Sequence, residues 1–170
     1  MRTRAVLVLT VAALAFVVLG VSAAAGAAPK LVGADGVAGL RLGTPAAALR
    51  GQGKIGPLRP GCELNPVQRI AKLRAPLSGF AIFNHRGRRL SALSLEGGVE
   101  TARGIRVGST AAAARGAYPA AVYQAPGTAD PFAEGFLWIN SPAHPAMTLI
   151  VDPATRRVEN ISVHAPNFCE

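Results

Sequence analysis

The sequence predicts an α+β protein built from two tandem units, each a short helix followed by a three- or four-stranded antiparallel β-meander. Two pairs of matching segments support this fold class. The segment GLRLGTPAAALRG at 39–51 returns as GIRVGSTAAAARG at 104–116, with eight of thirteen positions identical. A second match follows in the same order, between residues 80–96 and 148–164. Matching blocks in a fixed order indicate a duplicated unit.

The first match predicts one short helix in each unit. In the first unit Gly43 permits a sharp turn, Thr44 is expected to cap the helix, and Pro45 suits the first helical position. Residues 108–110 are expected to play the same part in the second unit. A run of alanines then carries the second helix, and Tyr118 with the proline after it is expected to end that helix.

The second match predicts a β-hairpin in each unit. Residues 84–87 and 152–155 are typical turn residues, and residues that favour strands lie on both sides of each turn. Further strands are expected over 134–140 and, on a weaker pattern, over 68–73. Each helix would therefore be followed by antiparallel strands.

The closing strand of the second unit alternates between apolar and polar residues. Ile161 and Val163 share one side, which we expect to face the core. Asn160, Ser162 and His164 share the other side, which we expect to face water. The pattern predicts a sheet with one buried face and one solvated face.

The N-terminus is typical of a secretory signal peptide. Arg2 and Arg4 precede an uncharged stretch, 5–28, that ends in small residues. Cleavage is expected between 23 and 28, with Ala25 preferred. The alternative is an uncleaved membrane anchor, because an uncharged stretch of this length can span a bilayer.

These observations divide the chain into four parts. They are a signal peptide over 1–25, a linker over 26–35, a first repeat unit over 36–100 and a second over 101–170. We expect both units to form one compact body in a bacterial protein that is secreted or held in the cell-envelope space. After cleavage no membrane contact is expected, and the protein is expected to be a monomer.

The charge of the chain is a weak guide to partners. Without Arg2 and Arg4 the chain keeps sixteen of its eighteen Lys and Arg residues and all nine acids, which leaves a formal charge of +7. Arginine, alanine, glycine and proline are abundant throughout, as a GC-rich coding bias would also produce. We expect no nucleic-acid partner.

No catalytic or cofactor signature is present in the sequence. It contains no G-x-S-x-G, H-E-x-x-H or G-x-x-x-x-G-K pattern, so we expect no enzyme, no cofactor and no metal site. His85, His144 and His164 are expected to be exposed histidines without chemistry. A small hydrolase without a familiar motif is the least favoured alternative.

The repeated pattern of an apolar-x-apolar segment, Gly43-Thr44 or Gly108-Ser109-Thr110, a short helix and a meander resembles the SmpA/BamE-like fold. In its tandem, secreted form it is similar to the β-lactamase-inhibitor-protein family, over most of residues 36–165. The family has Gly-Met-Thr at the turn and a disulfide within each repeat, whereas Cys62 and Cys169 of this chain lie in different halves. The resemblance implies a rigid extracellular binding scaffold, and no inhibitory residue is carried over.

Two groups of residues are candidates for partner contact. Tyr118 and Tyr123 flank the turn after the second helix, in a loop-rich stretch where exposed aromatics often bind partners. Phe136 and Trp138, within an expected strand, are interpreted as core residues.

Arginines at the two hairpin turns would form one basic rim if the units pack with like orientation; opposed units would separate them. They are Arg86, Arg88, Arg89, Arg156 and Arg157.

Together these features predict a secreted, non-catalytic module that binds an extracellular protein or a cell-wall component. The alternative is a structural envelope factor that binds cell-wall polyanions through the basic rim.

Export favours a disulfide between Cys62 and Cys169. In the chain-entropy model, closing so long a loop stabilises the protein by about 4 to 5 kcal/mol, and usually by less in practice. We expect Cys62→Ser to lower the melting temperature clearly. Two titratable thiols in the secreted wild-type protein would contradict the pairing.

Overall fold

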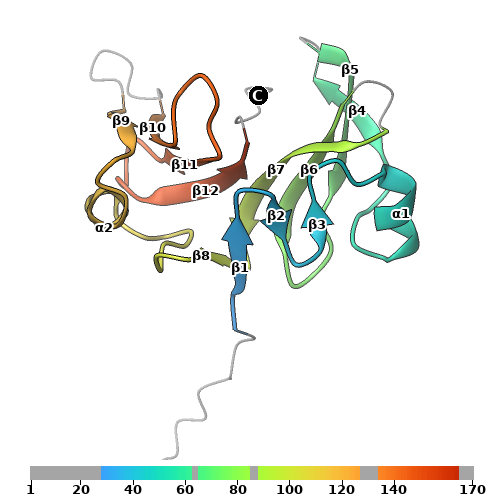
Figure 1. Ribbon diagram of the computed structural model, residues 1–170, viewed down its shortest axis with the longest axis horizontal. Coiled ribbons are helices and arrows are strands. Elements are labelled where there is room, and N and C mark those ends of the chain that lie inside the picture. The colour runs from blue at the N-terminus through green and yellow to red at the C-terminus, as the bar shows by residue number, and fades with distance from the viewer. Residues whose placement is uncertain (1–27, 63–64, 85–87, 127–133, 165–170) are drawn as a thin grey trace, which may run out of the picture.

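The computed structural model describes residues 28–62, 65–84, 88–126 and 134–164 of the chain. Within this part, strands make up 49% and helices 11% of the structure. The strands form a sheet of four and a sheet of eight, with two short helices beside them (Figure 1). The expected α+β class, with two helix-plus-meander units, is therefore wrong: the described chain is mostly β.

The larger sheet is antiparallel throughout. In sheet order its strands are β4 (Arg59–Cys62), β5 (Asn65–Lys72), β6 (Ser78–Phe83), β7 (Leu90–Gly97), β12 (Val158–Val163), β11 (Met147–Val151), β10 (Gly135–Ile139) and β9 (Val122–Gln124). The expected hairpins are the β6–β7 and β11–β12 pairs. The strand expected over 134–140 is β10, and the one expected over 68–73 falls largely on β5.

The pairing of β7 with β12 explains why separate units do not form. Leu93 lies opposite Val163, Ser94 opposite Ser162, and Leu95 opposite Ile161. Two separate meanders would each leave a long apolar edge strand unpaired, which is a site for aggregation. Antiparallel pairing removes both edges and relates the two strand sets by an approximate twofold axis near Ser94 and Ser162.

The smaller sheet was not expected from the sequence. Its strands, in order, are β3 (Leu40–Arg41), β2 (Gly36–Val37), β1 (Lys30–Gly33) and β8 (Val99–Thr101). β1 lies in the stretch expected as a linker and pairs in parallel with β8, so residues far apart in the sequence are joined. Val32, Val37, Leu40 and Val99 bring this sheet into the hydrophobic core.

The two helices are short and begin in the same way. They are α1 (Ala46–Gly51) and α2 (Ala111–Ala117). The first backbone N–H of each donates to a carbonyl of the neighbouring hairpin turn: Ala46 to Arg88 at 3.1 Å and Ala111 to Arg156 at 2.9 Å. Each helix therefore begins against the turn of its own hairpin.

The expected cap at Thr44 is wrong. Pro45 occupies the N-cap position of α1 and has no hydroxyl to accept a hydrogen bond. In α2 the equivalent residue is Thr110, whose side chain accepts from the Ala113 N–H at 3.1 Å. The residue equivalent to Thr44 is Ser109, and its hydroxyl accepts from the Arg106 N–H in the preceding turn.

An arginine fixes each turn that leads into a helix. The Arg89 Nη1 donates to the Gly43 carbonyl at 2.8 Å, and the Arg157 Nη1 donates to the Gly108 carbonyl at 2.6 Å. Gly43 and Gly108 have φ of +81° and +90°, the left-handed region that glycine adopts without strain. The two sequence blocks thus fold into the same local structure.

The core lies on one face of the larger sheet. Leu137, Leu149, Ile161 and Leu95 are consecutive partners across four strands, and all belong to the same buried cluster as the smaller sheet and both helices. Because neighbouring residues of a strand face opposite sides, the row Trp138, Thr148, Ser162 and Ser94 lies on the other face. We call that side the open face.

The open face is less solvated than the sequence predicts. Ser162 is only 1% exposed and donates its hydroxyl to the Leu93 carbonyl at 3.2 Å, and Asn160 is half-buried. Of the three polar residues assigned to water, only His164 is exposed. Phe136 and Trp138 also lie on this face, with ring centroids 5.1 Å apart, rather than in the main core.

Two buried threonines give a matched test of this packing. The Thr148 Oγ1 has no hydrogen-bond partner in the described structure, whereas the Thr101 Oγ1 accepts from the Ile105 N–H at 3.1 Å. A buried hydroxyl without a partner costs about 1 to 3 kcal/mol. We expect Thr148→Val to raise the free energy of unfolding by about 1 kcal/mol and Thr101→Val to lower it by about 1 to 2 kcal/mol. Urea unfolding measures both, and equal losses would contradict the assignment.

Candidate binding groove

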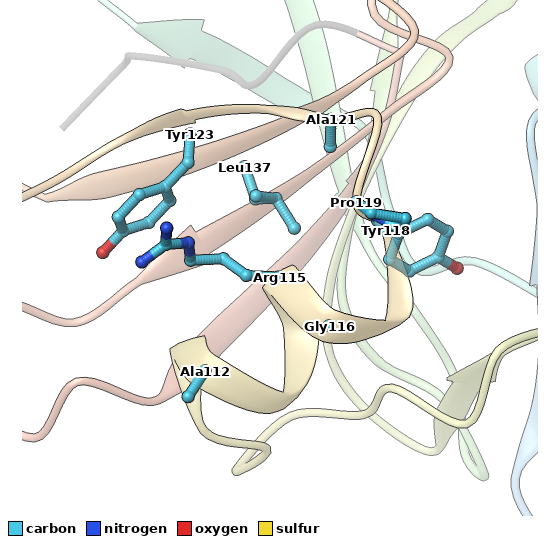
Figure 2. Close-up of a pocket in the computed structure, with 8 residues that line it drawn as sticks. All are labelled: Ala112, Arg115, Gly116, Tyr118, Pro119, Ala121, Tyr123 and Leu137. Carbon is cyan, nitrogen blue, oxygen red and sulfur yellow. The ribbon is translucent and has the colours of Figure 1, made fainter.

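A groove runs between α2 and the edge strand β9, and both candidate tyrosines line it. Figure 2 shows α2 along one side, β9 along the other and Leu137 of β10 between them. The cavity has a volume of about 450 Å³, and a second hollow of about 360 Å³ continues past Tyr118. We call the first cavity the α2–β9 groove; its lining residues are Ala112, Arg115, Gly116, Tyr118, Pro119, Ala121, Tyr123 and Leu137.

One end of the groove is an arginine stacked on a tyrosine. The Arg115 guanidinium reaches from the last turn of α2 and lies 4.7 Å from the centroid of the Tyr123 ring (Figure 2). Such a contact contributes about 0.5 to 1 kcal/mol at an exposed site. Stacking occupies the flat face of the guanidinium and leaves its N–H groups pointing outward along the edge of the plane.

The second hollow, past Tyr118, holds another pair of the same kind. The Arg103 guanidinium lies 5.3 Å from the centroid of the Tyr118 ring and donates from Nη1 to the Ala117 carbonyl at 2.6 Å. Arg103 sits in a tight turn in which the N–H of Gly104 donates to the Thr101 carbonyl at 2.9 Å. This turn, anchored by the buried Thr101, holds Arg103 against the end of α2.

The groove is positively charged. Among the residues that the structure describes, no acidic side chain lines either cavity, and none pairs with Arg115. Both guanidinium groups belong to exposed residues. Arg115 in the groove and Arg103 in the adjoining hollow are therefore two cations that already lie against aromatic rings.

The described residues of the first half lack the side chains that form this groove. Arg50 occupies the place of Arg115 in the repeated segment and is exposed in the last turn of α1. The residues after α1, 52–58, include no aromatic side chain, and Ala38 stands where the second half has Arg103. Arg50 is thus a natural control for Arg115.

The structure does not bring the hairpin arginines together. Because β7 and β12 are antiparallel, the turns that precede them lie at opposite ends of that pair, next to α1 and α2 (Figure 1). Arg88 and Arg89 are separated from Arg156 and Arg157, and Arg86 lies outside the described residues. One basic rim would require the two hairpins to point the same way, and they point in opposite directions.

The second turn also carries its own negative charge. Asp152 accepts hydrogen bonds from the Thr155 hydroxyl at 2.7 Å and the Thr155 N–H at 2.6 Å, and these lower the pKa of its carboxyl. Its carboxylate therefore stays ionised beside Arg156 and Arg157 and offsets part of their charge.

The remaining candidates lie apart from the groove. Cys62 ends β4, but Cys169 lies outside the described residues, so the disulfide stays a prediction. His85 is likewise outside them, and His144 and His164 are exposed. Within the described ranges no three His, Cys, Asp or Glu side chains gather at a metal-binding distance, and no helix is long and apolar enough to cross a membrane.

Sequence reasoning found the tyrosines of the groove but missed its arginines. Arg115 and Tyr123 are eight residues apart and meet only because β9 folds back over α2 to pair with β10. The only signal in the sequence is the contrast between repeats, since tyrosines follow the second helix and none follow the first.

The groove arginines are expected to contribute little to stability. Arg115 is exposed, and its contact with Tyr123 is of the weak, solvated kind. We expect both Arg115→Ala and Arg50→Ala to change the free energy of unfolding by less than about 1 kcal/mol. Urea unfolding measures this, and a loss above about 3 kcal/mol for Arg115→Ala would make Arg115 a structural residue.

The comparisons with known proteins leave the fold and the groove to be interpreted on their own. No protein-family model matches the chain, and neither a curated protein nor a solved structure matches it. The resemblance to the SmpA/BamE-like fold stays an expectation.

Proposed function

We propose that this chain is exported by its N-terminal leader and acts outside the cytoplasm as a non-catalytic binding module whose α2–β9 groove contacts a partner protein. The observation that carries the proposal is the groove itself, with Arg115 paired to Tyr123 inside it and Arg103 paired to Tyr118 in the adjoining hollow. The leader lies outside the described residues, so export rests on the sequence pattern at 1–28.

The composition of the groove suits protein recognition. Tyrosine and arginine are enriched among the residues that contribute most to protein–protein binding. Tyrosine supplies a large contact area with few rotatable bonds, so little conformational entropy is lost when it is buried. Here the contacts at 4.7 and 5.3 Å already restrict both arginines, which reduces the entropy lost on binding.

The polyanion-binding alternative has less support. It requires several arginines on one surface, because polyanion affinity grows with the number of anionic groups neutralised. The antiparallel β7–β12 pair separates the arginines of the first hairpin from those of the second. In each hairpin one arginine, Arg89 or Arg157, already donates to a backbone carbonyl. The α2–β9 groove, whose residues lie together, is therefore a better candidate for a binding site than the separated hairpin arginines.

Site-specific photo-crosslinking tests the proposed function. A benzoylphenylalanine is placed at Ala112, which lines the groove, or at Ala47, the exposed equivalent on α1. Cells that make the protein are irradiated, and adducts from the medium and the envelope are identified by mass spectrometry. We expect a discrete protein adduct from position 112 and none from position 47.

A second variant decides whether the adduct reflects the groove. Adding Arg115→Ala and Tyr123→Ala to the crosslinking protein is expected to reduce the adduct at least about tenfold, because it removes one end of the groove. No adduct at position 112, or equal adducts at both positions, would overturn the proposed function.

A further inference from the structure

We propose that the groove binds an extended, acidic peptide segment of its partner, which adds a strand to the outer edge of β9 and places one carboxylate on Arg115. This inference rests on the proposed function and specifies the chemistry of the partner. It comes from three observations: an unprotected sheet edge, the side on which Tyr123 faces, and the charge of the groove.

β9 is the less protected of the two edges of the larger sheet. The opposite edge, β4, contains Pro60, which has no N–H to offer to an added strand. β9 has the sequence Val-Tyr-Gln, without a proline or a charge, and no described strand lies beyond it. Exposed edge strands of this kind accept an extended peptide through main-chain hydrogen bonds.

The register of β9 specifies which peptide side chain meets the arginine. Tyr123 lies opposite Leu137, which belongs to the core cluster, so Tyr123 faces α2. A peptide residue directly opposite Tyr123 would face the same side, with its Cβ about 5 Å from that of Tyr123. Its side chain would then reach the guanidinium stacked over the ring.

The positive charge of Arg115 favours an acidic peptide residue opposite Tyr123. The outward N–H groups of a stacked guanidinium match the two oxygens of a carboxylate, and such charged pairs form short, strong hydrogen bonds. The peptide residues on either side of the acid would face the open side next to Val122, which is 48% exposed. Apolar or β-branched residues are expected there. The recognised sequence is thus apolar, acidic, apolar.

A second copy of this chain fits the edge less well. Two β9 edges would bring together two uncharged strands, and Arg115 of each copy would find no acid opposite it. Because β9 is only three residues long, main-chain pairing alone is limited. The carboxylate contact is therefore needed for both affinity and specificity.

The test is a selection of random octapeptides displayed on phage against the purified full-length protein. Selected peptides are expected to carry Glu or Asp between apolar residues at several times the frequency in the starting library. The best is then synthesised with a fluorescent label, and its affinity is measured by anisotropy. We expect Arg115→Ala to weaken binding about tenfold or more and Arg50→Ala to leave it unchanged.

Two further measurements test the geometry. Methylating the peptide amides one at a time is expected to abolish binding at alternate positions only, since an edge strand bonds to every second residue of its neighbour. Raising the salt concentration is expected to weaken binding to wild type more than binding to Arg115→Ala.

The outcomes separate this inference from the proposed function. Selected peptides without an acid that still lose affinity on Tyr123→Ala would overturn the acidic-peptide inference and leave the groove as a protein site. Acidic peptides that bind wild type, Arg115→Ala and Arg50→Ala alike would also overturn it. Failure to select any peptide, together with self-association that Tyr123→Ala disrupts, would show that the occupant is a second copy.

Discussion

The antiparallel pairing of β7 with β12 is the constraint on which the rest of the structure depends. It turns two strand sets into one sheet and places the apolar residues Leu93, Leu95, Ile161 and Val163 at its centre, each fully buried. The opposite orientation of the two halves follows from it. α1 and α2 therefore lie at separate ends of the molecule (Figure 1), and the first N–H of each donates to an arginine carbonyl of its own hairpin.

The contrast between the two ends lies in the stretch that follows each helix. The turn, the arginine on its carbonyl and the hydrogen bond from the first helical N–H to the hairpin are the same in both halves, and these contacts position the helix on the sheet. The stretch after the helix differs between the two halves. In the second half it carries Tyr118 and Tyr123, and the groove arises there without any change to the shared framework.

The sequence predicts local structure in this protein better than its assembly. The helices, the two hairpins and β10 follow from short patterns, since glycine turns, strand propensity and alternation act over a few residues. The fold class failed because the partner of β7 is set by contacts between residues almost seventy positions apart, which no periodicity encodes. The extended segment expected at 40–42 is β3, whereas β2 was missed because two residues give no period.

The same distinction applies to the candidate site. The tyrosines were predictable as aromatics in a loop-rich stretch, whereas Arg103 and Arg115 become site residues only through the fold. For Ser162 the local pattern was misleading. Its alternation with Ile161 and Val163 predicts a side chain exposed to solvent, yet Ser162 is buried at the centre of the open face.

The long-range pairing has a consequence for the order in which the chain can fold. β1 needs β8, and β7 needs β12, so neither sheet can be completed until most of the polypeptide is available. Folding dominated by such distant pairings is slow, because the entropy of closing a long loop is lost before the stabilising contacts form. The larger sheet can therefore be completed only once residues 158–163 are available to pair with β7 and β11.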